Sequence, residues 1–128
     1  MILGKENMTG KMEDIVNKLK NIVGQEWVIT KREYMESYLR DETPDVLRPS
    51  AAEDLVLVKP SSTEEVSEIL KAMNKTRIPV FPVGGRTGLV GGCVPTESGV
   101  ILSLERMNKI QIDKENLMAI AEAGATLA

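Results

Sequence analysis

Residues 55–85 read LVLVKPSSTEEVSEILKAMNKTRIPVFPVGG and hold two short apolar segments on either side of a helical repeat. The first, Leu55–Val58, is a continuous apolar run, which is typical of a strand buried on both faces. Ser62 and Glu65 have capping-box spacing, and apolar residues then follow at helical spacing. Ile78–Phe81 predicts the next strand. A strand, a helix and a strand over this length predict a right-handed, parallel βαβ unit.

A glycine-rich loop follows the second of these strands directly. It reads PVGGRTGLVGG over residues 82–92, and five of its eleven residues are glycine. Glycine lets main-chain N–H groups approach a ligand closely and adopts positive φ without strain, and successive N–H groups in such a turn bind anions. A diphosphate is therefore a natural ligand, to which Arg86 could add charge and Thr87 a hydroxyl. The glycine spacing fits neither the P-loop nor G-x-G-x-x-G, so on spacing alone a plain connector between strands stays open.

Further elements are predicted on both sides of this region. Apolar residues recur at helical spacing over residues 11–23 and stop before a glycine, which predicts a helix. Thr30 and Glu33 have capping-box spacing and predict a second short helix that ends near residue 39. Charged residues and prolines then predict a connecting loop. Downstream, the patterns predict a strand at residues 100–104 and a hairpin whose strands are residues 110–113 and 117–121.

The composition excludes several kinds of site. The 128 residues contain no histidine, and the single cysteine, Cys93, cannot form an internal disulfide or a thiolate metal cluster. The 16 basic and 19 acidic side chains are mixed along the chain, whereas a nucleic-acid-binding surface requires clustered basic residues. No segment approaches the ~18 apolar residues of a membrane span, and residues 1–10 lack the apolar part of a signal peptide. We therefore expect a cytoplasmic protein without a metal, nucleic-acid or membrane-spanning site.

Several stretches occur together in one recognisable order. They are the apolar strand ending in Lys59-Pro60-Ser61, the helix start Thr63-Glu64-Glu65-Val66, the run Pro79–Gly88 with Gly91-Gly92, the strand Val100–Leu104 and the segment Glu122–Thr126. With them, residues 45–128 resemble the FAD-binding domain of the vanillyl-alcohol oxidase and p-cresol methylhydroxylase (PCMH) superfamily, and most of all its D-lactate dehydrogenase and glycolate oxidase group of FAD-linked oxidases. The resemblance implies an α/β (α+β) fold, in which a small, mostly parallel sheet with flanking helices forms the first subdomain of a PCMH-type FAD-binding domain.

The resemblance also assigns a cofactor and the residues that bind it. Main-chain amides of the glycine loop would hold the diphosphate of FAD. The residues assigned to the cofactor are Pro82, Val83, Gly84, Gly85, Arg86, Thr87, Gly88, Leu89, Gly91 and Gly92. Relatives that attach FAD covalently often carry a histidine just after the paired glycines, but Arg86 occupies that place here, so FAD is expected to be bound non-covalently. No catalytic and no metal-binding residue is assigned to this chain.

The activity that the resemblance implies belongs to a longer protein. Residues 1–44 are expected to form an N-terminal helical lead, and residues 45–128 the first part of an FAD-binding domain that is incomplete at its C-terminus. The full-length relative would oxidise a small 2-hydroxy acid of the D-lactate or glycolate type, which is bound by domains absent from this chain. Two alternatives stay open. One is a non-catalytic nucleotide- or phosphate-binding module, and the other is a structural subunit of a split flavoenzyme, completed by a second chain or by a second copy.

Three residues outside the loop are given plain structural roles. Asp41 is expected in a solvated loop in which nothing shifts its pKa. Cys93 is expected to be a small buried apolar residue, because free cysteines are usually buried. Trp27 is expected to lie in the core between the first two helices.

Overall fold

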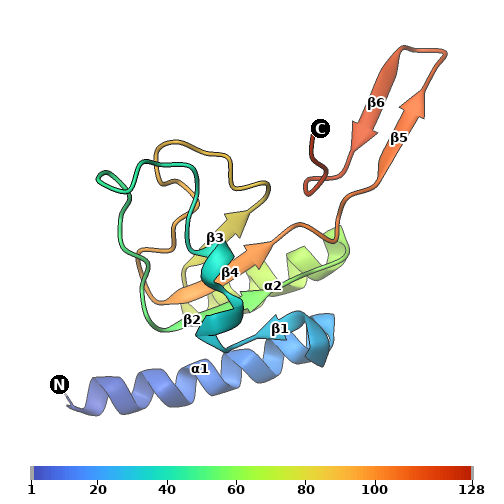
Figure 1. Cartoon of the computed structure of the whole chain (residues 1–128). Helices are drawn as coiled ribbons and strands as arrows, with labels where there is room; N and C mark the ends of the chain where they lie inside the picture. Colours follow the sequence, from blue (N-terminus) through green and yellow to red (C-terminus); the bar gives the residue numbers. More distant parts are fainter. Residues whose placement is uncertain (1, 128) are drawn as a thin grey trace.

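The computed structural model describes residues 2–127, with side chains from residue 10 onward. The elements are α1 (Ile2–Val23), η1 (Gln25–Trp27), β1 (Val28–Ile29), η2 (Arg32–Tyr34), η3 (Glu36–Tyr38), β2 (Leu55–Val58), α2 (Thr63–Thr76), β3 (Val80–Val83), β4 (Gly99–Ser103), β5 (Ile110–Asp113) and β6 (Met118–Ala121). Strands β1, β2, β4 and β3 form one sheet in that order, and β5 and β6 form a separate hairpin (Figure 1). β2 and β3 both pair parallel with β4, whereas β1 pairs antiparallel with β2. The predicted small, mostly parallel sheet is confirmed, and β4 lies between the two strands of the predicted βαβ unit.

Two helices cover one face of the four-stranded sheet. Ile15, Leu19 and Val23 lie one helical turn apart along α1, and all three are buried. They share a hydrophobic cluster with two residues of α2 and with alternate residues of the central strands, namely Ile69, Met73, Val56, Val58, Val100 and Leu102. Alternation arises because successive side chains of a strand point to opposite faces. The helix itself begins at Ile2 rather than at the predicted residue 11, since the residues before that point lack the apolar repeat that marked it.

The opposite face of the sheet is covered by the segment that contains η2 and η3. Leu55 and Leu57 of β2 lie in one cluster with Met35 and Leu39. The predicted second short helix is present as two 3-10 helices rather than one, and the predicted cap at Thr30 is wrong, because Lys31 precedes the first of them without a side-chain cap. An α-helix of so few residues is marginal by itself, so packing on the sheet determines the conformation.

Helix α2 begins at the predicted cap and ends at Thr76. The Ser62 hydroxyl accepts a hydrogen bond from the Glu65 main-chain N–H at 3.2 Å, which confirms the cap. The Glu65 carboxylate turns to the N–H of Ser61, at 2.7 Å, rather than to that of Ser62. At the other end Arg77 adopts a left-handed conformation with φ 57°, and the Ile78 N–H donates to the helix. β3 therefore begins at residue 80, two residues after the predicted start.

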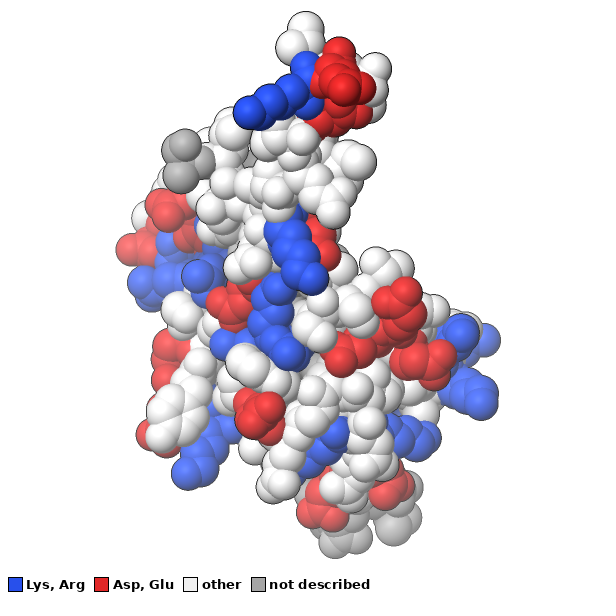
Figure 2. Space-filling model, turned by 90° about the vertical axis from the view of Figure 1, so that its right-hand side faces the viewer, with Lys and Arg blue, Asp and Glu red and all other residues white. Residues whose placement is uncertain are grey.

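The β5–β6 hairpin projects from the rest of the molecule (Figure 1). Its turn is held by Asp113, whose carboxylate accepts hydrogen bonds from the main-chain and side-chain N–H groups of Asn116, and Leu117 takes a left-handed φ of 54°. β6 accordingly begins at Met118, one residue later than predicted. Figure 2 shows charged side chains at the tip of this projection and uncharged surface below them. The exposed apolar residues of the hairpin are Ile110, Ile112, Leu117, Met118 and Ile120.

Gly99 begins β4 at a place where a side chain has no room. A β-carbon there would overlap the carbonyl oxygen of Pro79 and would lie 3.3 Å from the Pro79 Cβ. Replacing Gly99 with Ala should lower the free energy of unfolding by about 2 kcal/mol, because overpacking forces the backbone to shift. Urea unfolding checks this against Gly92→Ala, where no atom lies within 4 Å of the new β-carbon. Equal unfolding midpoints for the two variants would contradict the prediction.

Candidate functional site

The glycine loop leaves the sheet at the carboxyl end of β3. The carboxyl ends of β2 and β4 lie at the same edge, because all three strands are parallel, and ligands of open α/β sheets bind at such an edge. Two other segments flank the loop. On one side, Gly84 and Gly85 lie beside the turn that follows β6, with the added-Cβ positions 4.0 Å from Ala123 O and from Thr126 Cγ2. On the other side, the segment from Ser37 to Pro49 contacts the end of the loop.

The backbone of the loop differs from what the glycines alone predicted. Positive φ occurs at Arg86, with 59°, and at Gly91, with 75°, but not at Gly84 or Gly85. Gly91 is required by its conformation and by contact, since a β-carbon there would lie 2.9 Å from Pro49 Cδ. The paired glycines therefore serve a different purpose from Gly91. They leave open space above the chain rather than permit a left-handed turn.

Five successive main-chain amides of the loop have no hydrogen-bond partner. Among the hydrogen bonds of residues 2–127, none uses the N–H of any residue from 84 to 88. A left-handed residue inside a run of free N–H groups is the backbone arrangement of an anion-binding nest. Residues Gly84, Gly85, Thr87 and Gly88 are exposed, so an anion can reach these amides from solvent. The residues present therefore fit a diphosphate.

The Arg86 side chain lies against the protein rather than over the loop. Its guanidinium stacks on the Tyr38 ring at 4.6 Å from the centroid, and Nη1 donates to the Ser37 carbonyl oxygen at 3.0 Å. The charge stays close to the loop, but two contacts already hold the side chain. Direct contact between Arg86 and a phosphate, which the sequence suggested, would require it to leave them.

Lys59 and Glu105 form an ion pair beside the same tyrosine. Their Nζ and Oε1 atoms lie 2.7 Å apart, and the Tyr38 hydroxyl donates to Glu105 Oε1 at 2.6 Å. Burial alone lowers the pKa of Lys59 and raises the pKa of Glu105. The hydrogen bonds among the three residues outweigh burial, so the pKa of Lys59 is raised and that of Glu105 is lowered. Both side chains are charged at neutral pH, and this partly exposed pair contributes less than about 1 kcal/mol.

The other residues assigned to the loop, together with Cys93 and Trp27, differ in how far they are buried. Val83 is buried, whereas Pro82, Leu89 and Gly92 are exposed. Cys93 is half-buried rather than buried, because it lies in the exposed part of the loop. Trp27 packs against the core of the helix-covered face, and the Arg106 guanidinium stacks on its ring at 3.8 Å.

The expectation for Asp41 is wrong. Its side chain is only 6% exposed, and Thr43 is only 2% exposed. The pKa of Asp41 is lowered, first by a hydrogen bond with the Thr43 side chain, and burial opposes this shift more weakly. The run of charged and polar residues before Pro44 gave no sign of this burial, because its cause is contact with the distant glycine loop.

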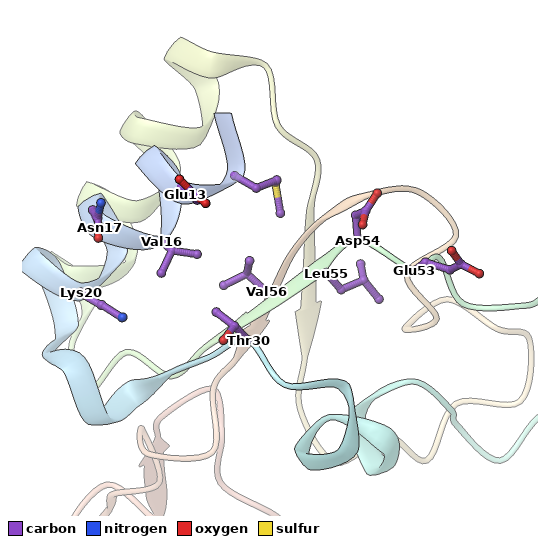
Figure 3. A pocket seen from close by; sticks show the side chains of 10 residues that line it. Glu13, Val16, Asn17, Lys20, Thr30, Glu53, Asp54, Leu55 and Val56 are labelled. Atoms are coloured by element: carbon purple, nitrogen blue, oxygen red, sulfur yellow. The ribbon is translucent and has the colours of Figure 1, made fainter. Parts of the chain in front are cut away.

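A groove of about 580 Å³ lies elsewhere, between α1 and the start of β2 (Figure 3). Val16, Asn17 and Lys20 of α1 line one side, and Glu53 and Asp54 lie at the entrance to β2. This is the amino end of the parallel strands, at the opposite edge of the sheet from the glycine loop. Within residues 2–127, no group of three or more His, Cys, Asp and Glu side chains could hold a metal ion, and no helix is both long enough and apolar enough to cross a membrane.

The fold and the loop together define a class of protein, an α/β domain with an exposed run of free main-chain amides at the carboxyl edge of its parallel strands. Comparison with known proteins gives the family. Residues 55–128 match the FAD binding domain family, and the chain belongs to it. FAD is its cofactor.

Curated relatives are flavoenzymes of the expected group. The chain is 54% identical over 92 residues to D-lactate dehydrogenase of Archaeoglobus fulgidus, covering 72% of this chain and 21% of that protein. It is 42% identical over 69 residues to the glycolate oxidase protein GlcD of Bacillus subtilis, covering 53% of this chain and 15% of that protein. The chain thus matches only 15–21% of the length of these relatives. Its resemblance to the D-lactate dehydrogenase and glycolate oxidase group is confirmed.

A solved structure gives the same answer for the fold. p-Cresol methylhydroxylase with bound substrate superposes with a TM-score of 0.73 at 26% identity, covering 91% of this chain and 23% of that one. The PCMH-type fold is therefore confirmed.

Proposed function

We propose that the glycine loop is the place where this chain binds FAD. The observation that carries the proposal is the run of five free amides from residue 84 to residue 88, beside two glycines with open space above them. Amides that have no partner in the protein can donate to phosphate oxygens without breaking an existing bond. Gly91 and Gly92 shape the far end of the loop, and Lys59 and Arg86 add positive charge nearby.

We further propose that the whole protein oxidises a small 2-hydroxy acid. Support comes from the D-lactate dehydrogenase and glycolate oxidase relatives. FAD supplies the hydride-accepting chemistry when bound, and this chain supplies binding and orientation. Its buried carboxylate, Asp41, contacts the loop from the protein side and is not free to exchange protons with a substrate. We therefore assign the catalytic residues to parts of the protein outside these 128 residues.

The isolated chain should bind FAD weakly and should have no oxidoreductase activity. Weak binding is expected because the exposed loop offers its amides to the diphosphate alone and leaves the ring systems open, and affinity follows enclosure. Flavin fluorescence titration should give micromolar or weaker binding, and added D-lactate or glycolate should not reduce an artificial electron acceptor. The longer protein that contains this chain should be yellow when purified and should oxidise one of these acids. Nanomolar binding or turnover by the isolated chain would contradict the prediction.

A specific observation supports a partner surface. The hairpin exposes Ile110, Ile112 and Ile120, and a nearly apolar groove of about 440 Å³ lies between α2, β3 and β4. A two-stranded hairpin is marginally stable by itself, so another polypeptide segment is needed to cover these surfaces. We propose that this segment is the rest of a longer chain, or, as the alternative, a second chain or a second copy. A protein that becomes yellow only with another polypeptide would favour the alternative.

We also propose a cytoplasmic location for the protein. The single cysteine supports it, because proteins of reducing compartments rarely depend on disulfides.

A further inference from the structure

The glycine loop is attached to a segment that carries no recognisable motif, residues 37–43. Hydrogen bonds at three loop residues make the attachment. Arg86 Nη1 donates to Ser37 O at 3.0 Å and to Ser37 Oγ at 3.3 Å, the Glu42 N–H donates to Gly88 O at 3.0 Å, and the Gly91 N–H donates to Thr43 Oγ1 at 2.8 Å. These contacts reach the middle and the end of the loop. We call residues 37–43 the brace.

Two buried polar side chains, Asp41 and Thr43, lie near the C-terminal end of the brace. Asp41 Oδ1 accepts the Thr43 main-chain N–H at 3.0 Å. The pKa of Asp41 is lowered, and the neighbouring Thr43 side chain is the largest cause. A hydroxyl oxygen can accept hydrogen bonds, and Thr43 Oγ1 accepts the Gly91 N–H at 2.8 Å. Asp41 thus holds the backbone of the residue whose hydroxyl holds the loop.

The contacts also determine which way the loop amides point. In a trans peptide the C=O and the following N–H point in opposite directions, and residues 2–127 contain no cis peptide bond. Because Gly88 O is turned toward Glu42, the N–H of Leu89 points away from the brace. Because Val83 O accepts the Leu104 N–H, the N–H of Gly84 points away from β4. The first amide of the run, that of Gly84, is thereby turned away from β4, and the amide that directly follows the run, that of Leu89, is turned away from the brace.

One oxygen of the buried carboxylate has no partner. Asp41 Oδ2 makes no hydrogen bond within the described part of the chain, and it lies 3.6 Å from the position that a Gly88 β-carbon would take. A buried oxygen without a partner costs stability and calls for an explanation. The burial of Asp41 is therefore not accounted for by a gain in stability. It is accounted for by the hydrogen bond through which Asp41 positions Thr43.

We propose that the brace presets the glycine loop for the FAD diphosphate, with Thr43 as the positioning residue and the Asp41 carboxylate holding the Thr43 main chain in place. The inference rests on the proposed function of the loop. A loop ordered before the ligand arrives loses less conformational entropy on binding, so its affinity is higher. The brace touches only the protein side of the loop, so it acts on FAD through the position of the amides.

The test compares Thr43→Val with Thr43→Ser in the 128-residue chain. Valine keeps the shape and loses the hydroxyl, whereas serine keeps the hydroxyl. In Thr43→Val, hydrogen exchange of the Gly91 amide measured by NMR without FAD should accelerate about fivefold, as loss of one net hydrogen bond predicts. The FAD dissociation constant should rise about tenfold. Thr43→Ser should stay within about twofold of the parent in both measurements, and exchange at Ile101 should not change in either variant.

Thr76→Val is the matched control, because the Thr76 hydroxyl bonds Ala72 O inside α2, far from the loop. It should leave Gly91 exchange and FAD affinity unchanged. Asp41→Asn carries the same test if Thr43→Val does not fold, and it should accelerate Gly91 exchange relative to the parent chain and weaken FAD binding.

Each other outcome overturns the proposal. Unchanged Gly91 exchange in Thr43→Val would show that the hydroxyl does not hold the loop. Faster exchange with unchanged FAD affinity would show that the brace does not preset the site. If Gly85→Val abolishes binding in the same titration, that second result leaves the proposed function of the loop intact. If Gly85→Val also binds FAD normally, the proposed function fails together with this inference.

Discussion

Replacing Gly85 with Val is expected to abolish FAD binding and to leave the fold intact. The reason is steric, since the β-branched side chain would fill the open space through which phosphate oxygens reach the free amides. Losing two charge-assisted hydrogen bonds of about 1.5–3 kcal/mol each weakens affinity by on the order of 100-fold or more. The fold should tolerate the change because the nearest atom to the new β-carbon, Thr126 Cγ2, lies 4.0 Å away. Gly85 does not have positive φ, so the variant introduces no left-handed strain.

The measurement is FAD occupancy together with the melting temperature of the FAD-free protein, in the longer protein that retains the cofactor. Arg86→Ala is the matched companion, because it removes a charge and leaves the amides in place. Its affinity for FAD should fall only about threefold to fivefold, as expected for one nearby, partly screened charge. Wild-type occupancy in Gly85→Val with an unchanged melting temperature would make the loop a plain connector between strands.

Replacing Leu57 with Ala should have the largest effect on stability. Leu57 is 0% exposed and lies in the centre of β2, where it packs with Met35 and Leu39 on the face opposite the helices. Removing a buried leucine side chain costs about 2–5 kcal/mol through lost transfer free energy and the cavity left behind. That is a large share of the ~5–15 kcal/mol by which a domain is usually stable.

Urea unfolding followed by circular dichroism measures this effect. With an m-value of about 1–3 kcal/mol per molar urea, the midpoint should fall by roughly 1–3 M. Leu70→Ala is the control, since Leu70 is 46% exposed on α2 and leucine and alanine are both good helix formers. A midpoint for Leu57→Ala equal to that of Leu70→Ala would contradict the assignment of Leu57 to the core.

Sequence patterns predicted the parts of the fold that depend on neighbouring residues. The apolar run of β2 and the cap at Ser62 are local, and both were predicted at the correct residues. The order of the strands is not local, because any of several arrangements satisfies the same apolar runs. Residues 30–39 show the limit clearly. Their helical spacing is real, but contact of Met35 and Leu39 with the sheet determined the backbone instead.

The candidate site divides in the same way. The glycines indicated an anion-binding loop, and the free amides of residues 84–88 agree with that prediction. The brace could not be predicted, because Thr43 and Gly91 are 48 residues apart and neither belongs to a pattern that links them. The sequence also could not show that the Arg86 side chain would stack on Tyr38, since that contact likewise joins distant segments.

The place of β4 in the middle of the sheet has a consequence for synthesis of the chain on the ribosome. β2 and α2 are made first and β3 follows, but neither β2 nor β3 has a parallel partner until residues 99–103 emerge. Up to that point β2 can pair only with the two residues of β1. Its leucines, which are buried in the folded sheet, stay partly exposed until the sheet is complete. Pairings between distant residues form slowly, and unpaired strands are the species that chaperones bind. The four-stranded sheet can therefore form only after β4 has been synthesised, when β4 pairs with β2 on one side and with β3 on the other.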